Sequence, residues 1–445
     1  MFRKTKIILL INLASLFFLS CPPIVVADQL RNAIDQDYAY LDVLFKYFHA
    51  HPELSMQEVE TSKRLSQEIE ALGFKMTRNI AKTGFVGLMK NGDGPTVMIR
   101  ADMDGLPIEE KSGLSYASNN RQINLRGEEV PVMHACGHDM HMTALVGTAR
   151  RLAAMKDQWR GTLMLLGQPA EEAEGGAEAM IKDRLYERVG RPDYALALHV
   201  NSNTVAGNVY FADGLMYSSA DTVRITINGV GTHGAAPHNG KDPIVIGSQI
   251  VMALQTIVSR EISPLQPAVI TVGSFHSGDA PNVISDKAVL ELSVRANSEE
   301  VRTYLLDSIE RVAINTARTA GVSENSLPEI FIYTDGVPTM INDAALAQRL
   351  RPVLTKTMGK SRVLPFVQKD MIAEDFPWLV RVKPAIPSVY FSVGGTSREV
   401  LDVAAAGGRP VADHHSALFK IDPEPSIKTG VEVMTNAAME LFAKP

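Results

Sequence analysis

The sequence predicts an α/β fold with a mostly parallel sheet, interrupted by a smaller inserted α+β unit. Short apolar strands alternate with helical segments up to about residue 217, and the same order resumes after residue 328. Between these points, residues 222–227 alternate between polar and apolar side chains, as in a strand with one exposed face. The predicted divisions are therefore residues 28–217 and 329–445 for the larger unit and residues 218–328 for the insertion.

The composition is that of an ordinary globular protein. The chain has 445 residues, of which 45% are hydrophobic and 21% charged, which is enough for two or three domains. The formal net charge is -6, and no basic run stands out, so we expect no nucleic-acid partner.

The first residues predict a secretory signal. Three basic residues, Arg3, Lys4 and Lys6, precede an apolar run at residues 7–19. Small residues follow this run and lead to a cleavage point after Ala27. The run is short for a membrane span, so residues 1–27 predict export to the periplasm or medium. A lipoprotein anchor at Cys21 is the less favoured alternative, because Phe18 stands where such signals usually carry Leu. An uncleaved membrane anchor is a further alternative.

The segments of the first part follow in order. Apolar residues at helical spacing predict helices at residues 29–48 and 57–72, and Gly73 suits the end of the second. The strands and helices predicted after them are residues 85–89 (strand), 96–100 (strand), 140–155 (helix), 162–166 (strand), a helix from about 176, and 194–198 (strand).

The inserted unit and the last part complete the order. In the insertion, the pattern predicts a helix at residues 242–260, strands at 269–275 and 287–295, and a helix at 298–320. After it come a helix at 343–358, a strand at 388–392 and a final helix at 424–442.

A cluster of metal-binding residue types precedes the 140–155 helix: His134-Ala135-Cys136-Gly137-His138-Asp139-Met140-His141. A thiolate and an imidazole separated by one glycine suit Zn²⁺ or a similar divalent ion. The chain has only two cysteines, so Cys136 is alone once a signal carrying Cys21 is removed. One leftover cysteine in an exported protein indicates a reactive or metal-bound thiol.

Polar residues follow several predicted strands directly: Asp102, Glu171, Glu172 and His199. In an open parallel sheet, ligands bind beyond the carboxyl ends of the strands, so these residues and Cys136 are expected at one edge. Taken singly, each has a plain structural reading. The Glu pair could favour a helix dipole, His199 could be a core histidine, and His414-His415 could be a loop pair. Together, those readings require several coincidences at one edge, so the pattern predicts a metal site.

The ordered motifs resemble the peptidases and amidohydrolases of family M20, in the subgroup of hippurate hydrolases, N-acyl-amino-acid amidohydrolases and plant auxin-conjugate hydrolases. The resemblance covers nearly all of the chain after the signal. Its motifs are His51-Pro52-Glu53-Leu54-Ser55, Arg100-Ala101-Asp102-Met103-Asp104-Gly105-Leu106-Pro107, His134 to Asp139, Gln168-Pro169-Ala170-Glu171-Glu172, His199-Val200, residues 231–243, Pro281-Asn282-Val283-Ile284, Glu374-Asp375-Phe376 and His415-Ser416.

The resemblance implies a role for each matching position. Two divalent ions, of Zn, Mn, Co or Ni, would be held by Cys136, His138, Glu172, His199 and His415, with Cys136 as the bridging ligand. Glu171 would be the general base. The insertion would be a dimerisation and lid domain, so the resemblance implies a homodimer in which His233 reaches the site of a neighbouring subunit. Asn282 and Arg295 would contact the carboxylate of the substrate.

Two departures from the family pattern bear on the ligands. The position of Asp102 is often a metal-binding histidine, which His138 would replace here. Ala417 stands where a proline often follows the last metal histidine, and His414 beside His415 leaves the choice of that ligand open.

The predicted function is hydrolysis of the amide bond of N-acyl amino acids by a two-metal amidohydrolase. A dipeptidase or carboxypeptidase of the same family is the alternative. A non-catalytic binding protein is a third possibility, but binding alone does not require a free base such as Glu171. A serine hydrolase is disfavoured, since no Gly-x-Ser-x-Gly motif is present.

Overall fold

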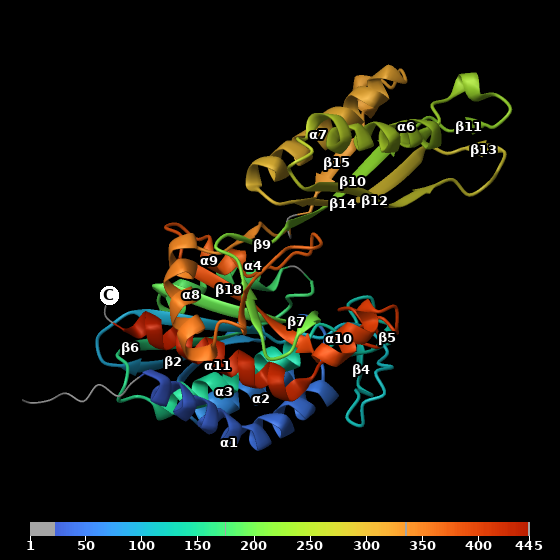
Figure 1. Ribbon diagram of the computed structural model, residues 1–445. Coiled ribbons are helices and arrows are strands. Elements are labelled where there is room, and N and C mark those ends of the chain that lie inside the picture. The colour runs from blue at the N-terminus through green and yellow to red at the C-terminus, as the bar shows by residue number, and fades with distance from the viewer. Residues whose placement is uncertain (1–22, 174, 334–335, 444–445) are drawn as a thin grey trace, which may run out of the picture.

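An eight-stranded sheet forms the centre of the larger of two units (Figure 1). The computed structural model describes residues 23–173, 175–333 and 336–443. Up to residue 22, the predicted signal lies outside these residues, and the first helix begins at Pro23.

The large sheet is mixed, with a parallel centre. Strands β6, β3, β7 and β18 are parallel to one another, whereas at one edge β2 is antiparallel to β6 and β1 is antiparallel to β2. The predicted α/β fold with a mostly parallel sheet is thereby confirmed. In spatial order the strands are β1 (Lys75–Ile80), β2 (Gly84–Asn91), β6 (Gly161–Gln168), β3 (Thr96–Asp102), β7 (Tyr194–Val205), β18 (Ser388–Thr396), β8 (Val209–Phe211) and β17 (Val363–Pro365).

Helices cover both faces of this sheet. One face carries α1, α2, α3 and α11, and α4 and α9 lie on the other, toward the inserted unit (Figure 1). Their apolar faces and the strands enclose one core, since buried side chains of α1, α3, β3, β6 and α11 belong to a single cluster. The helices of this unit are α1 (Pro23–Ala50), α2 (Val59–Glu70), α3 (His138–Ala154), α4 (Gly176–Lys182), α5 (Leu185–Val189), α8 (Ala344–Met358), α9 (Pro377–Val380), α10 (Arg398–Ala405) and α11 (Pro423–Phe442).

Two boundaries near the predicted site differ from the sequence pattern. The helix expected from Met140 begins at His138, because Gly137 adopts φ +93° and turns the chain directly into α3. The strand expected to end at Leu198 continues to Val205, because β18 pairs with it along this length. His199 therefore lies within β7 and not after it.

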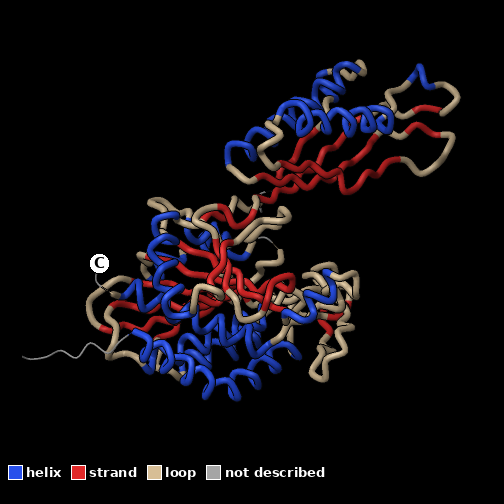
Figure 2. The backbone as a smooth tube through the Cα atoms, in the orientation of Figure 1, coloured by secondary structure: helices blue, strands red, loops and turns tan. Residues whose placement is uncertain are grey.

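The inserted unit has its own sheet and core. Its four antiparallel strands are covered on one face by two helices, and the other face is open (Figure 2). Buried residues such as Ile225, Leu292 and Leu305 form a second hydrophobic cluster. In spatial order the strands are β12 (Ala268–Ser277), β14 (Lys287–Ala296), β10 (Ser219–Asn228) and β15 (Glu329–Ile332), and the helices are α6 (Pro243–Thr256) and α7 (Glu299–Thr319).

The pairing of β15 with β10 places residues 329–332 in this sheet, beyond the boundary predicted at residue 328. Short elements complete the two units: β4 (Arg121–Ile123) with β5 (Glu129–Pro131), β9 (Leu215–Tyr217) with β16 (Met340–Ile341), β11 (Thr232–His233) with β13 (Val283–Ile284), the 3-10 turns Pro237–Asn239 and Glu324–Ser326, and the π-helical turn Ile257–Glu261.

Candidate metal centre

The turn from Cys136 to His138 has room only for glycine between them. A Cβ atom on Gly137 would lie 2.3 Å from Cγ1 of Val200, and its φ of +93° disfavours other residues. The thiol of Cys136 is buried at this turn, and His138 opens α3 beside it. The tight turn therefore places a sulfur and an imidazole on the same side of the sheet edge.

One ring nitrogen of His138 is hydrogen-bonded, and the other has no hydrogen-bond partner. Its Nδ1 lies 2.8 Å from the main-chain oxygen of Asp104, which only accepts, so Nδ1 carries the proton. Its Nε2 is buried without a hydrogen-bond partner, 3.7 Å from Oε2 of Glu171 and 3.9 Å from Oε1 of Glu172. Oε1 of Glu172 is likewise buried and unpartnered. Buried nitrogen and oxygen atoms that lie close together without hydrogen-bond partners are expected where side chains bind a cation.

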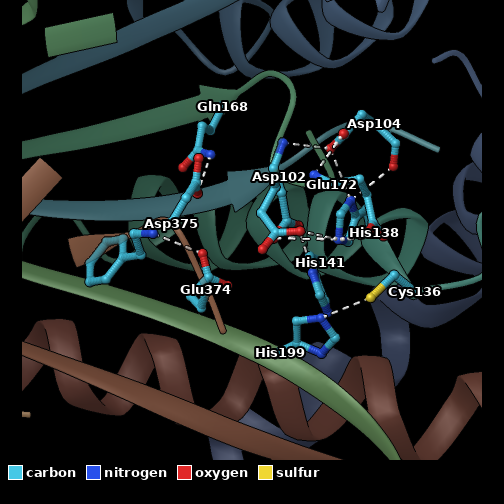
Figure 3. A network of polar contacts seen from close by, with 12 residues as sticks. Asp102, Asp104, Cys136, His138, His141, Gln168, Glu172, His199, Glu374 and Asp375 are labelled. Atoms are coloured by element: carbon cyan, nitrogen blue, oxygen red, sulfur yellow. Dashed lines mark hydrogen bonds and ion pairs between the residues drawn. The ribbon is translucent and has the colours of Figure 1, made fainter. Parts of the chain in front are cut away.

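His199 faces the sulfur of Cys136, and His415 faces the carboxylate of Glu172. Nδ1 of His199 donates to the main-chain oxygen of Val200 at 2.6 Å, and its Nε2 lies 3.3 Å from Sγ of Cys136 (Figure 3). Nε2 of His415 lies 3.2 Å from Oε2 of Glu172. The main-chain N–H of His415 donates to the oxygen of Ala135, which holds this loop against the Cys136 turn.

Two donor sets share the Cys136 sulfur. In each set, one ligand atom per residue lies within 4.8 Å of the others: Cys136, His138 and His199 form one set, and Cys136, Glu172 and His415 form the other. All five residues predicted as ligands thus meet at one place. Thiolate, imidazole and carboxylate are the donors that Zn²⁺ and the neighbouring first-row divalent ions accept.

The charges around the sulfur also call for cations. Burial raises the pKa of the Cys136 thiol well above its usual value, and the carboxylates of Glu172 and Glu171 raise it further. A thiolate at this position therefore requires positive charge beside it. The residues fit a pair of divalent ions.

Histidines 141 and 414 are not part of these sets. Nδ1 of His141 lies 2.6 Å from Oδ1 of Asp102, and its Nε2 accepts the N–H of Val200 at 2.8 Å, so both ring nitrogens are used. The ring of His414 packs against His199, with centroids 5.2 Å apart. His415, and not His414, is the histidine that faces Glu172.

The loop that carries Glu171 and Glu172 is held by Asp104, whose role the sequence pattern did not predict. Its carboxylate accepts the N–H of Glu171 at 3.1 Å and that of Glu172 at 3.0 Å. The same residue holds His138 through its main-chain oxygen (Figure 3), so it positions both the ligands and the base. A signal was present: Asp104 follows Asp102 by two residues, just beyond the end of β3.

Glu171 faces a second group of acids. Its carboxylate shares a region 4.8 Å across with those of Glu374 and Asp375. Both acids are paired with the buried guanidinium of Arg100, at 2.8 Å and 3.1 Å. Burial and then the charge of Glu374 raise the pKa of Glu171 well above its usual value. Glu171 is therefore a carboxylate suited to receiving a proton.

The predicted substrate contacts divide into two places. Arg295 lines a pocket of about 290 Å³ together with Cys136, Glu171, His199 and Tyr217. His233 instead lies in β11 and Asn282 directly precedes β13, at the end of the inserted unit that points away from the larger unit (Figure 1), and neither residue lines this pocket. There, Nδ1 of His233 accepts the N–H of Ala235 at 3.0 Å. Within one chain, the structure does not bring these two residues to the metal centre.

A buried carboxylate beside donors for divalent cations is the arrangement that metal-dependent hydrolases use to activate water. The site therefore indicates a metal-dependent hydrolase.

The chain belongs to one family of that class. The model of Peptidase family M20/M25/M40 matches residues 98–440, and the resemblance drawn from the motifs is thereby confirmed. The chain is accordingly a hydrolase of amide bonds.

Two curated relatives and one solved structure indicate the range of the family around it. The hippurate hydrolase of Campylobacter jejuni is 38% identical over 75% of this chain and 83% of its own length. The N-acetyl-L-cysteine deacetylase of Bacillus subtilis is 37% identical over 69% of this chain and 72% of its own. A dinuclear metal binding peptidase from the M20 family of Bacillus subtilis superposes with a TM-score of 0.72 at 25% identity, covering 93% of this chain and 99% of its own.

Proposed function

We propose that this chain hydrolyses the amide bond of N-acyl amino acids, giving a carboxylic acid and an amino acid, with two divalent metal ions at Cys136. The observation that carries the proposal is the sharing of one sulfur by two donor sets, with the carboxylate of Glu171 beside them. Relatives that act on hippurate and on N-acetyl-L-cysteine support N-acyl amino acids as the substrate class.

Each residue then has a chemical task. When bound by the two sets, a pair of divalent ions lowers the pKa of a water molecule and polarises the scissile carbonyl. Glu171 takes the proton that this water loses as its oxygen bonds to the carbonyl carbon. It then gives the proton to the nitrogen, so that the amine leaves neutral as the carbon–nitrogen bond breaks.

Arg295 supports recognition of the free carboxylate on the amino-acid side. It lies on β14 and reaches the wall of the pocket that holds Glu171. A guanidinium binds a carboxylate through two parallel hydrogen bonds, which orients as well as attracts it.

The test is hydrolysis by the metal-stripped protein reloaded with Zn²⁺, Mn²⁺, Co²⁺ or Ni²⁺. N-acetyl and N-benzoyl amino acids should be cleaved in at least one loaded form, and chelation should abolish the activity. Faster cleavage of dipeptides with a free amine would favour the dipeptidase alternative. No hydrolysis of any of these amides by a fully loaded protein would contradict the proposal.

We infer that His233 and Asn282 serve the site of a second copy in a homodimer. Both lie at the tip of the inserted unit, away from the pocket of their own chain. The unit also has an exposed apolar surface on α6: Ile244 is 44%, Val245 52% and Met252 70% exposed. Exposed apolar side chains on this helix support an interface there. An imidazole donor brought from the partner would steady the oxyanion that forms on the carbonyl.

We propose export after cleavage near Ala27, supported by the basic and apolar segments that precede it. N-terminal sequencing of the mature protein from its native host should begin at Asp28. A lipid-modified Cys21 at the terminus would establish the alternative.

A further inference from the structure

Residues in the segment from Glu53 to Glu58 hydrogen-bond to Asp104 and Ala170, which lie next to the metal centre. Ser55 donates its hydroxyl proton to Oδ2 of Asp104 at 2.6 Å. The carboxylate of Glu53 accepts the N–H of Thr61 at 2.7 Å in the first turn of α2. Glu58, at the start of that helix, is completely buried, and its hydrogen bonds go to Met56, Thr83 and Ala170, none of which is a predicted ligand.

Glu58 uses both carboxylate oxygens. Oε1 accepts the N–H of Met56 at 2.9 Å and that of Ala170 at 2.8 Å, and Oε2 accepts the hydroxyl of Thr83 at 2.6 Å. Met56 and Ala170 both have left-handed backbones, with φ of +61° and +51°. A residue with a Cβ atom is disfavoured in that region and persists there only where its surroundings hold it.

Ala170 immediately precedes Glu171 and Glu172. The N–H groups of residues 170, 171 and 172 point in succession at two buried carboxylates: the first at Glu58 and the next two at Asp104. Releasing the first would free Ala170 to return to an ordinary backbone. Because Glu171 follows directly, that rotation would move both carboxylates from their places beside His138 and His415.

We propose that Glu58 is a positioning residue for the two carboxylates of the metal centre, acting through the backbone of Ala170. The inference rests on the proposed roles of Glu171 as base and Glu172 as ligand. Its measurable consequence is that metal affinity depends on the acceptor at Oε1, and not on the contact of Oε2 with Thr83.

Three variants separate these contacts. Glu58→Ala removes the acceptor for Ala170. Glu58→Gln keeps an oxygen for the two N–H groups and offers an amide N–H to the Thr83 hydroxyl. Thr83→Val, the matched control, removes only the third bond. Affinity for Co²⁺ and Zn²⁺ is measured by competition with a chromophoric chelator, and unfolding is followed in the same preparations.

Glu58→Ala should bind the more weakly held ion about 10 to 100 times less tightly, as is usual when a residue supporting a ligand is lost. Glu58→Gln and Thr83→Val should stay within about threefold of the native affinity, well below that range. Adding Ala170→Gly to Glu58→Ala should restore part of the affinity, since glycine tolerates the left-handed backbone unaided. If Glu58 only stabilised the fold, adding Ala170→Gly would not be expected to restore metal affinity to Glu58→Ala.

Native affinity in Glu58→Ala, or an equal loss in Thr83→Val, would overturn the proposal. If Glu58→Ala does not fold, Glu58→Asp replaces it, because its shorter side chain keeps the charge but withdraws the oxygen from Ala170. The same losses are then expected, and their absence again overturns the idea. Since metal binding is read without substrate, a failure here is distinct from a failure of native protein to hydrolyse N-acyl amino acids.

Discussion

Glu171 and Glu172 are adjacent in sequence, yet their carboxylates have different neighbours. Glu172 lies 3.2 Å from His415 and belongs to a donor set with Cys136, whereas Glu171 faces the acids paired with Arg100. Glu171→Gln should therefore fold and hold both ions while kcat falls by roughly 10²–10⁴, the usual worth of a positioned acid–base group. Glu172→Gln should instead contain less bound metal than Glu171→Gln. Elemental analysis and steady-state kinetics of both variants decide this, and the reverse pattern would mean that the two roles are exchanged.

His49 provides a prediction for pH dependence. It is buried with Nδ1 2.7 Å from Asp139 and Nε2 3.0 Å from Glu110. Burial lowers its pKa, but the bonds to Asp139 and Glu110 raise it more, to about 10. A folded-state pKa above the unfolded one gives stability that is complete below the ordinary value of 6.5 and is lost as the pH rises toward 10.

Replacing His49 by Gln leaves two buried carboxylates without a cation. At pH 6 the free energy of unfolding should fall by about 3–5 kcal/mol relative to the native chain. The difference should shrink as pH rises from about 6.5 to about 10, measured by denaturant unfolding of both proteins at each pH. A difference that stays constant across this range would show that the His49 cluster is not ionic.

At the scale of elements, the turn before α3 sets the geometry of the site. Gly137→Ala combines a left-handed backbone with a Cβ contact of 2.3 Å to Val200 on β7. Gly113→Ala is a matched control, because Gly113 has φ +77° and open space around it. Both should lose about 1–2 kcal/mol of stability from backbone strain. Only Gly137→Ala should lose more than this and also bind metal weakly. Equal losses in denaturant unfolding would contradict the steric account.

The elements themselves were largely predictable, because their periodicity is local. Alternation of strands and helices predicted the α/β class, and polar residues after the strands predicted where the ligands gather. The exact ends were not predictable where pairing decides them: β7 extends past His199 only because β18 runs beside it. Likewise, no local pattern shows that β15 returns to pair with β10.

Supporting residues were harder to predict than ligands. The pairing of Arg100 with Glu374 joins residues 274 apart in sequence, and the bond from Ala170 to Glu58 joins residues 112 apart. A single sequence carries no signal for such distances. The ligands were predictable because Cys and His in close spacing have few other uses, whereas buried acids and arginines have many.

At the scale of the whole molecule, the position of His233 requires a second chain if it is to act on a metal centre. His233→Ala should lower kcat by roughly 10²–10³, the cost of one oxyanion donor. Mixing inactive His233→Ala subunits with inactive Glu171→Gln subunits should restore activity, since a mixed dimer would contain one complete site. Exchange of subunits is verified by differential tagging. Mixed dimers without activity would confine His233 to its own chain or to no catalytic role.

The central claim is that Cys136 holds two ions at once, and titration of the metal-stripped protein with Co²⁺ tests it most directly. Thiolate-to-cobalt charge transfer reports each cobalt ion bound to sulfur. We predict that two equivalents bind per chain, that the charge-transfer band grows with both, and that Cys136→Ser shows no band and holds less metal. Two ions bound at native affinity by Cys136→Ser, or a band that stops growing after one equivalent, would contradict the account.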